Sequence, residues 1–205
     1  MDNDLHPAVA AAVADRAGYV PDGIDLGFEP FGDDVEVRVF GDRLEIAYVA
    51  LDPWPDTRFW KDDGKRGTFR RFRAASARER HLRRLADQGS VAFDVVTDAE
   101  GTFVPRLVGA VPDPVAVYAL PEDSGSLGDM QAALAEAAEI LEAFSAWGRG
   151  ESCGIVVDRF TVDPDTRAAT LLDSEPAWLQ LGPAAAGARL ASCLDREHEA
   201  SPGLR

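Results

Sequence analysis

Two neighbouring segments alternate apolar and polar residues in the way that predicts a β-hairpin. They run from Asp34 to Phe40 and from Arg43 to Leu51, and the Gly41-Asp42 pair between them suits a two-residue type II′ turn. Counting outward from this turn gives the expected pairs on one face, Val39 with Leu44, Val37 with Ile46 and Val35 with Tyr48, and Arg38 with Glu45 on the other. We expect the first face to be core and the second to face water.

Apolar residues at spacings of three and four predict a long amphipathic helix from Leu127 to Trp147. These residues are Leu127, Met130, Leu134, Ala137, Leu141 and Phe144. Ser126 followed by Asp129 is typical of a capping box, and Gly148 is expected to end the helix. The same spacing suits a dimer seam, but it covers only about three heptads, so a core helix lying on a sheet is favoured.

Weaker patterns predict three further helices and five further strands. The helices are expected at Pro7–Ala17, at Ala77–Gln88 with a Ser76-x-x-Glu79 capping box, and from Pro183 to about Arg196. The strands are expected at Ser90–Thr97, Thr102–Ala110, Val115–Leu120, Gly154–Val162 and Ala168–Leu172. Pro105 makes the second of these an edge strand or a bend, because proline cannot donate to a neighbouring strand.

The resulting order, α-ββ-α-βββ-α-ββ-α, predicts an α+β fold. Its antiparallel or mixed sheet is built from hairpins, with helices packed on it. The length of 205 residues suits a single α+β domain, which we assign to residues 1–196, followed by a polar C-terminal tail at 197–205. Glycine and proline mark Gly18–Asp33 and Asp52–Thr68 as loops.

Hydropathy excludes two classes of protein, those that span a membrane and those that carry a signal peptide. No apolar run reaches the roughly 18 residues of a membrane span, so no membrane partner is expected. The acidic start of the chain lacks the basic region of a signal peptide, and a cytoplasmic protein is therefore expected.

Charge is distributed unevenly along the chain. The formal net charge is −15, from 36 acidic and 21 basic residues. Between Arg58 and Arg84, eleven bases and three acids leave +8, while the other ten bases and 33 acids carry −23. A strongly negative protein disfavours a generic polyanion partner, so this one basic segment is the feature that needs an explanation.

Aromatic and basic residues interleave at the start of the basic segment. Arginines fork onto phosphate oxygens and flat rings stack on exposed bases, so the pattern suits a polyanion. The predicted polyanion-binding residues are Arg58, Lys61, Lys65, Arg66, Arg70, Arg71, Arg73, Arg80 and Arg84, with Trp54 and Trp60 as stacking or anchor groups. Two alternatives stay open: Phe69 and Phe72 are core anchors, or acids of this chain or of a second copy neutralise the arginines.

Catalytic and metal-binding patterns are weak, and no cofactor is expected. Two cysteines forty positions apart make no zinc motif, and buried free thiols are the simpler interpretation. Gly150-Glu151-Ser152-Cys153-Gly154 matches the nucleophile elbow in letters, but a helix precedes it and a strand follows, which is the reverse of the required order. Asp56 and Asp63-Gly64-Lys65 imitate the two acids and lysine of metal-dependent nucleases, although within a loop.

Three functions of different kinds follow from these observations. The leading hypothesis is a non-catalytic binding protein that engages nucleic acid or an acidic protein surface through residues 54–84. The first alternative is an acidic interaction protein, such as an inhibitor, an immunity-like or a chaperone-like factor, that binds a basic partner. The second is a metal-dependent phosphoesterase that uses Asp56, Asp63 and Lys65. Homodimer formation stays open.

Overall fold

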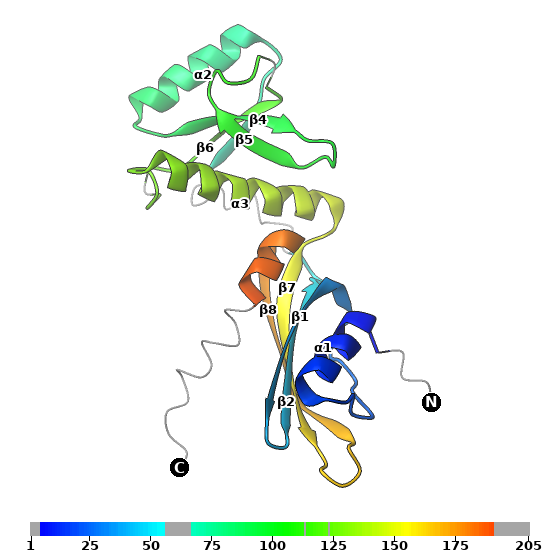
Figure 1. Ribbon diagram of the computed structural model, residues 1–205. Coiled ribbons are helices and arrows are strands. Elements are labelled where there is room, and N and C mark those ends of the chain that lie inside the picture. The colour runs from blue at the N-terminus through cyan, green and yellow to red at the C-terminus, as the bar shows by residue number, and fades with distance from the viewer. Residues whose placement is uncertain (1–4, 56–66, 113, 123, 191–205) are drawn as a thin grey trace. The chain divides into compact units, whose positions relative to one another are not determined.

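A computed structural model describes residues 5–55, 67–112, 114–122 and 124–190 (Figure 1). Contacts within the chain group it into two compact units, one made of Met1–Trp54 with Glu151–Arg205 and the other of Pro55–Gly150. Each unit has its own sheet, and each is described by itself. The single domain over residues 1–196 stays a prediction, and the polar tail at 197–205 lies outside the described residues.

The sheet of the first unit has four antiparallel strands in the order β1-β2-β7-β8. They are β1 (Pro30–Phe40), β2 (Arg43–Leu51), β7 (Cys153–Val162) and β8 (Ala169–Leu181). The predicted hairpin is confirmed residue by residue, with Val39 opposite Leu44, Val37 opposite Ile46 and Val35 opposite Tyr48. Gly41 has φ +62° in its turn, a conformation in which glycine has no steric penalty.

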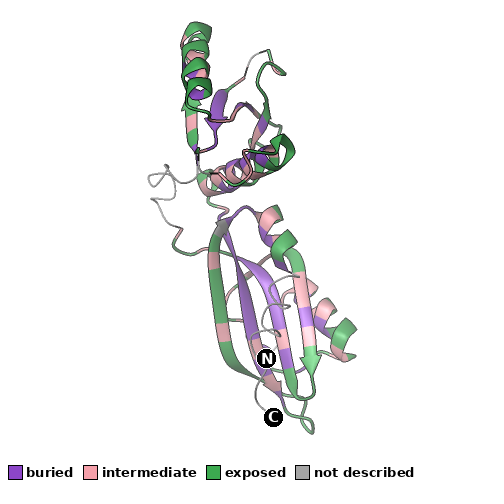
Figure 2. Cartoon of the chain, turned by 90° about the vertical axis from the view of Figure 1, so that its left-hand side faces the viewer, coloured by how far each residue is buried: buried purple, intermediate pink, exposed green. Residues whose placement is uncertain are grey.

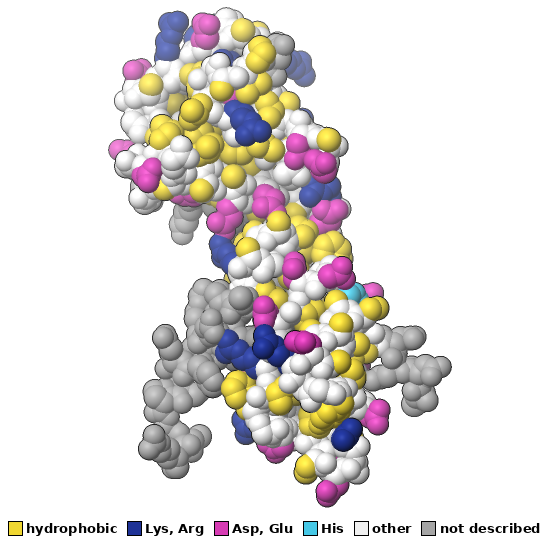
Figure 3. Space-filling model, viewed as in Figure 1, with side chains coloured by type: hydrophobic (Ala, Val, Ile, Leu, Met, Phe, Trp, Pro, Cys, Tyr) yellow, Lys and Arg dark blue, Asp and Glu magenta, His cyan; other side chains and the backbone are white. Residues whose placement is uncertain are grey.

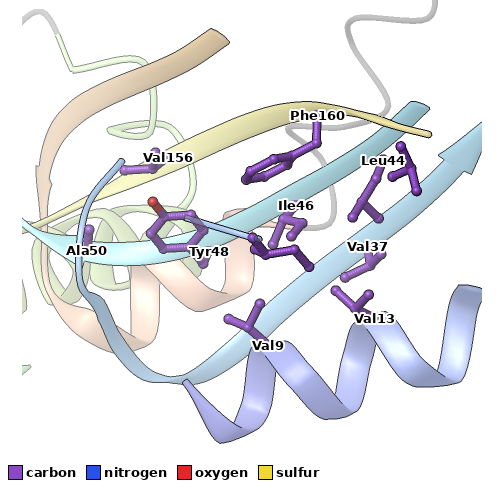
Figure 4. Packing of buried hydrophobic residues seen from close by; sticks show 11 residues of the cluster. Val9, Val13, Val37, Leu44, Ile46, Tyr48, Ala50, Val156 and Phe160 are labelled. Carbon is purple, nitrogen blue, oxygen red and sulfur yellow. The ribbon is translucent and has the colours of Figure 1, made fainter. Parts of the chain in front are cut away.

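Both faces of this sheet are covered. Helix α1 (Pro7–Ala17) places Val9 and Val13 against Ile46 and Phe160 (Figure 4). On the other face, Ala186 and Leu190 of the helical residues 183–190 pack on the alternate positions of β2 and β7. The central strands are accordingly the most buried (Figure 2), which follows from apolar side chains on both of their faces.

The second unit is a sheet between two helices. Its strands are all antiparallel in the order β3-β6-β4-β5 and comprise β3 (Thr68–Arg71), β4 (Ala92–Thr97), β5 (Phe103–Leu107) and β6 (Ala116–Ala119). Helix α3 (Met130–Arg149) packs Ala137 and Leu141 on Phe93 and Tyr118. This confirms a core helix on a sheet. Helix α2 (Ala75–Asp87) packs Leu85 on the alternate strand residues, which lie on the opposite face.

The α+β class is confirmed, with two antiparallel sheets instead of one. The predicted order matches the observed order, α-βββ-α-βββ-α-ββ-α, except that it lacks β3, whose residues were not predicted to form a strand. β8 continues to Leu181, well beyond the predicted end at Leu172. Pro105 does lie on an edge strand. The last helix is described only over residues 183–190, so its predicted end near Arg196 lies outside the described residues.

Both predicted capping boxes are wrong. Helix α3 begins after Asp129, whose Oδ1 accepts hydrogen bonds from the backbone N–H groups of Gln131 at 2.9 Å and Ala132 at 3.5 Å. The Ser126 hydroxyl donates instead to Glu136. The helix also runs through Gly148 and ends at Gly150, which has φ +77°. Helix α2 begins after Ala74, without a side-chain cap.

Among the described residues, no helix combines the length and the apolar character needed to cross a membrane.

Candidate functional site

Strand β3 carries the described start of the basic segment, and its alternation sends neighbouring side chains to opposite faces. The Phe69 ring lies on the α3 face, with its centroid 5.2 Å from that of Phe103 and 5.6 Å from that of Phe144. The guanidinium carbon of Arg71 lies on the same face, 5.4 Å from the Phe103 centroid. Phe69 is therefore a core anchor, as one of the two alternatives predicted.

The opposite face of β3 brings Arg70 toward helix α2. Its guanidinium carbon lies 5.7 Å from the Phe72 ring centroid, and the Phe72 ring lies 5.3 Å from that of His81. Phe72 also packs on the apolar cluster that contains Leu85. Both phenylalanines of the segment are thus engaged inside the unit, and neither is a free platform for a base.

The arginines of helix α2 differ in their surroundings, since one pairs with a buried acid and the others are exposed. Arg78 forms an ion pair with the fully buried Asp94 through Nε at 3.1 Å and through Nη2. The other oxygen of this carboxylate accepts from the Gly109 backbone N–H at 2.8 Å. Because Asp94 neutralises its charge, Arg78 has a structural role and is not counted among the residues available to a ligand. The carboxylate of Glu79 lies 3.8 Å from exposed Arg83, a pair that contributes little in water.

Five arginines of the basic segment are exposed and form no ion pair with a described carboxylate. They are Arg70, Arg71, Arg73, Arg80 and Arg84. Arg80 and Arg84 are neighbours one turn apart on α2, where two like charges cost about 0.2 to 0.5 kcal/mol. Acidic side chains occur at many places on the face drawn in Figure 3, yet none pairs with these five within the described part of the chain.

His81 is the residue that the sequence analysis missed. It is only 9% exposed, and neither ring nitrogen has a hydrogen-bond partner among the residues that the structure describes. Burial lowers the pKa of the imidazole, and the charges of Arg70 and Arg84 lower it further. The position of His81 among arginines depends on Arg70 of β3, a strand that the sequence did not predict.

Several predicted site residues lie outside the described residues. These are Arg58, Trp60, Lys61, Lys65 and Arg66, together with Asp56 and Asp63 of the nuclease-like pattern. Trp54 lies in the first compact unit and is 80% exposed, so its ring is not part of the core. Its backbone N–H donates to Asp52 Oδ1 at 2.9 Å, which fixes the turn that follows β2.

The described residues form neither a metal site nor a nucleophile elbow. Among them, no group of three or more histidine, cysteine or acidic side chains is arranged to hold a metal ion. Ser152 is 2% exposed between the end of α3 and the start of β7, which is the helix-before-strand order expected from the sequence. Cys153 is a buried free thiol, as expected, and burial followed by the charge of Glu151 raises its pKa to about 11.

A buried polar cluster in the first unit fastens the loop before β1. The Tyr48 hydroxyl donates to Asp158 Oδ2 at 2.8 Å, and the Gly27 backbone N–H donates to the same oxygen at 2.8 Å. Burial, and next the charge of Asp158, raise the pKa of Tyr48. A surface pocket of about 550 Å³ lies along the loop, between His6 and Pro30. The Phe28 backbone N–H also donates to the Tyr48 hydroxyl, at 3.0 Å, so side chains of β2 and β7 hold the loop in place, which indicates a structural role.

Comparison with protein-family models, with curated proteins and with solved structures finds no match to the chain. The second unit presents the five exposed arginines without ion pairs to described carboxylates.

Proposed function

We propose that the protein is a non-catalytic binding protein that engages an anionic partner through its basic segment. The observation that carries this proposal is a set of exposed arginines that form no ion pair with any described acid, in a chain of net charge −15: Arg70, Arg71, Arg73, Arg80 and Arg84. Guanidinium groups bind phosphate and carboxylate groups through paired hydrogen bonds. In a chain with 36 acids, arginines that meet none of the described ones are available to a ligand.

The alternative of internal neutralisation receives little support from the described residues. Only Arg78 and Arg83 of the segment are paired there, and only Arg78 is paired with a buried acid. Neutralisation by a second copy of the chain stays open, as does an acidic interaction protein that binds a basic partner. The metal-dependent phosphoesterase stays a prediction, because its residues lie outside the described part. Cytoplasmic localisation is likewise a prediction.

Retention on a heparin column at low salt tests the proposal, because an acidic protein without a cationic face elutes at once. We expect the full chain to be retained, and a variant with all five arginines changed to glutamine to elute early. The matched control changes Arg38, Arg106, Arg149, Arg159 and Arg167 to glutamine, which removes the same charge outside the segment. Equal retention of the two variants would show that the segment is not the binding surface.

A further inference from the structure

Arg70, Phe72, His81 and Arg84 form one continuous arrangement between β3 and α2. Arg70 lies over Phe72 and Phe72 lies beside His81, with the separations given above. Arg84 follows His81 by three residues on α2, so the two side chains are neighbours on the helix surface. Two cations from two different elements are therefore placed around one neutral ring.

The buried ring itself needs an explanation. His81 is nine-tenths buried, and within the described part of the chain its two nitrogens have no hydrogen-bond partner, although a buried unsatisfied polar group destabilises a fold. The charged groups that act on it are Arg70 from β3 and Arg84 from its own helix. The same face also holds Arg78, three residues before His81 on α2, and Asp94 of β4, but these two charges pair with each other. The remaining side chains of this face, Leu82, Leu85, Val117 and Ala119, are apolar. An apolar residue would pack here without that cost.

The geometry points to a phosphodiester site on this face, where Arg70 and Arg84 hold the anion and the bound negative charge favours uptake of a proton by His81. Binding at this site is therefore tighter in mildly acidic solution. This inference rests on the proposed function and specifies its ligand and its regulation. The anion is held by the two guanidinium groups and acts on His81 through its charge, without contact to the buried nitrogens. The proton comes from solvent, and no covalent bond changes.

The arrangement favours phosphate over carboxylate. A carboxylate has two oxygens, and the fork of one guanidinium can occupy both of them. A phosphodiester offers oxygens to a second guanidinium at the same time, which suits arginines that arrive from two elements. Proton uptake follows from reciprocity, because a ligand that favours protonated His81 must itself be bound better by the protonated form.

The test measures binding of an oligothymidylate of about ten nucleotides to the full chain at low salt, near pH 8 and near pH 6. The charge of this probe is constant over that range. The variants are Arg70→Gln and Arg84→Gln, and the matched control is Arg83→Gln, which removes the same charge one residue away but from a side chain that already faces Glu79. His81→Leu tests whether proton uptake by His81 causes the pH dependence of binding.

We expect Arg70→Gln and Arg84→Gln each to weaken binding about fivefold to tenfold, and Arg83→Gln to weaken it less than about twofold. The unmodified chain should bind about fivefold more tightly near pH 6 than near pH 8, and His81→Leu should lose this difference. Equal weakening by all three arginine variants, or an unchanged pH dependence in His81→Leu, overturns the inference. The arginine variants alter exposed side chains, so they report even where His81→Leu folds poorly.

Two further outcomes separate this inference from the proposed function. Salt-dependent binding that ignores Arg70, Arg84 and His81 refutes the phosphate site and leaves the proposed function standing. No salt-dependent binding of any polyanion refutes both. If a glutamate decapeptide competes as well as the oligothymidylate, the ligand is an acidic protein surface and the phosphodiester assignment is wrong.

Discussion

Two ion pairs that involve helix α2 show how burial decides what a charged residue does. Asp94 has no exposed surface and meets Arg78, whereas Glu79 and Arg83 both face water. Changing Asp94 to alanine leaves a partly buried guanidinium unpaired, and we expect a loss of about 3 kcal/mol in the free energy of unfolding. Glu79→Ala should cost less than about 0.5 kcal/mol. Urea unfolding of the two variants measures both values, and similar losses would show that Asp94 is not a buried partner.

His81 makes stability depend on pH. Its folded-state pKa lies below the ordinary 6.5, so the unfolded chain binds the proton more readily. The free energy of unfolding is therefore unaffected by this proton above about pH 6.5, and it falls as the pH drops from there toward and below the folded-state pKa. We expect His81→Leu to remove this loss and to raise stability by about 1 kcal/mol at neutral pH, because an unsatisfied polar group disappears. Unfolding curves near pH 7.5 and near pH 5.5 test this, and a variant with an unchanged pH slope contradicts it.

At the scale of elements, the residues that cap the helices differ from those that the sequence predicts. Asp129 caps α3, whereas Ser76, the predicted cap of the second helix, lies inside the first turn of α2. Asp129→Ala should therefore cost about 1 kcal/mol of stability and Ser76→Ala close to nothing. Thermal unfolding of both variants gives the comparison, and a larger effect at Ser76 would restore the predicted cap.

The elements that the sequence predicts well are those with a long and unambiguous period. The β1–β2 hairpin and its register follow from the Gly41-Asp42 turn and from alternation on either side of it, and α3 follows from twenty residues of helical spacing. β3 was missed because its four residues, of which Arg70 and Arg71 are two, show no apolar alternation. Its place at a sheet edge comes from pairing with β6, far along the chain. The same omission hid His81, whose arginine neighbour lies on β3.

At the scale of the whole molecule, the second unit is an insertion into a hairpin of the first. Leu51 of β2 pairs with Cys153 of β7, and the Asp52 backbone N–H donates to the Ser152 carbonyl at 2.8 Å. The two ends of the inserted residues therefore leave from adjacent points, which is where insertions are tolerated.

Replacing residues 55–150 by a short glycine-rich turn should leave a protein that folds, because the sheet and both of its covered faces belong to the remaining chain. We expect the shortened chain to unfold cooperatively and to give dispersed amide signals in its NMR spectrum. A molten or aggregated product would mean that the units depend on each other, as the prediction of one domain implies.

The most direct measurement of the central claim is the salt dependence of oligothymidylate binding. Each phosphate neutralised on a single strand contributes about −0.7 to the slope of log K against log salt concentration. Changing Arg70, Arg71, Arg73, Arg80 and Arg84 to glutamine should therefore reduce the slope by up to about 3.5, with a large loss of affinity. An unchanged slope in this variant would contradict the account, because the exposed arginines would then have no part in binding.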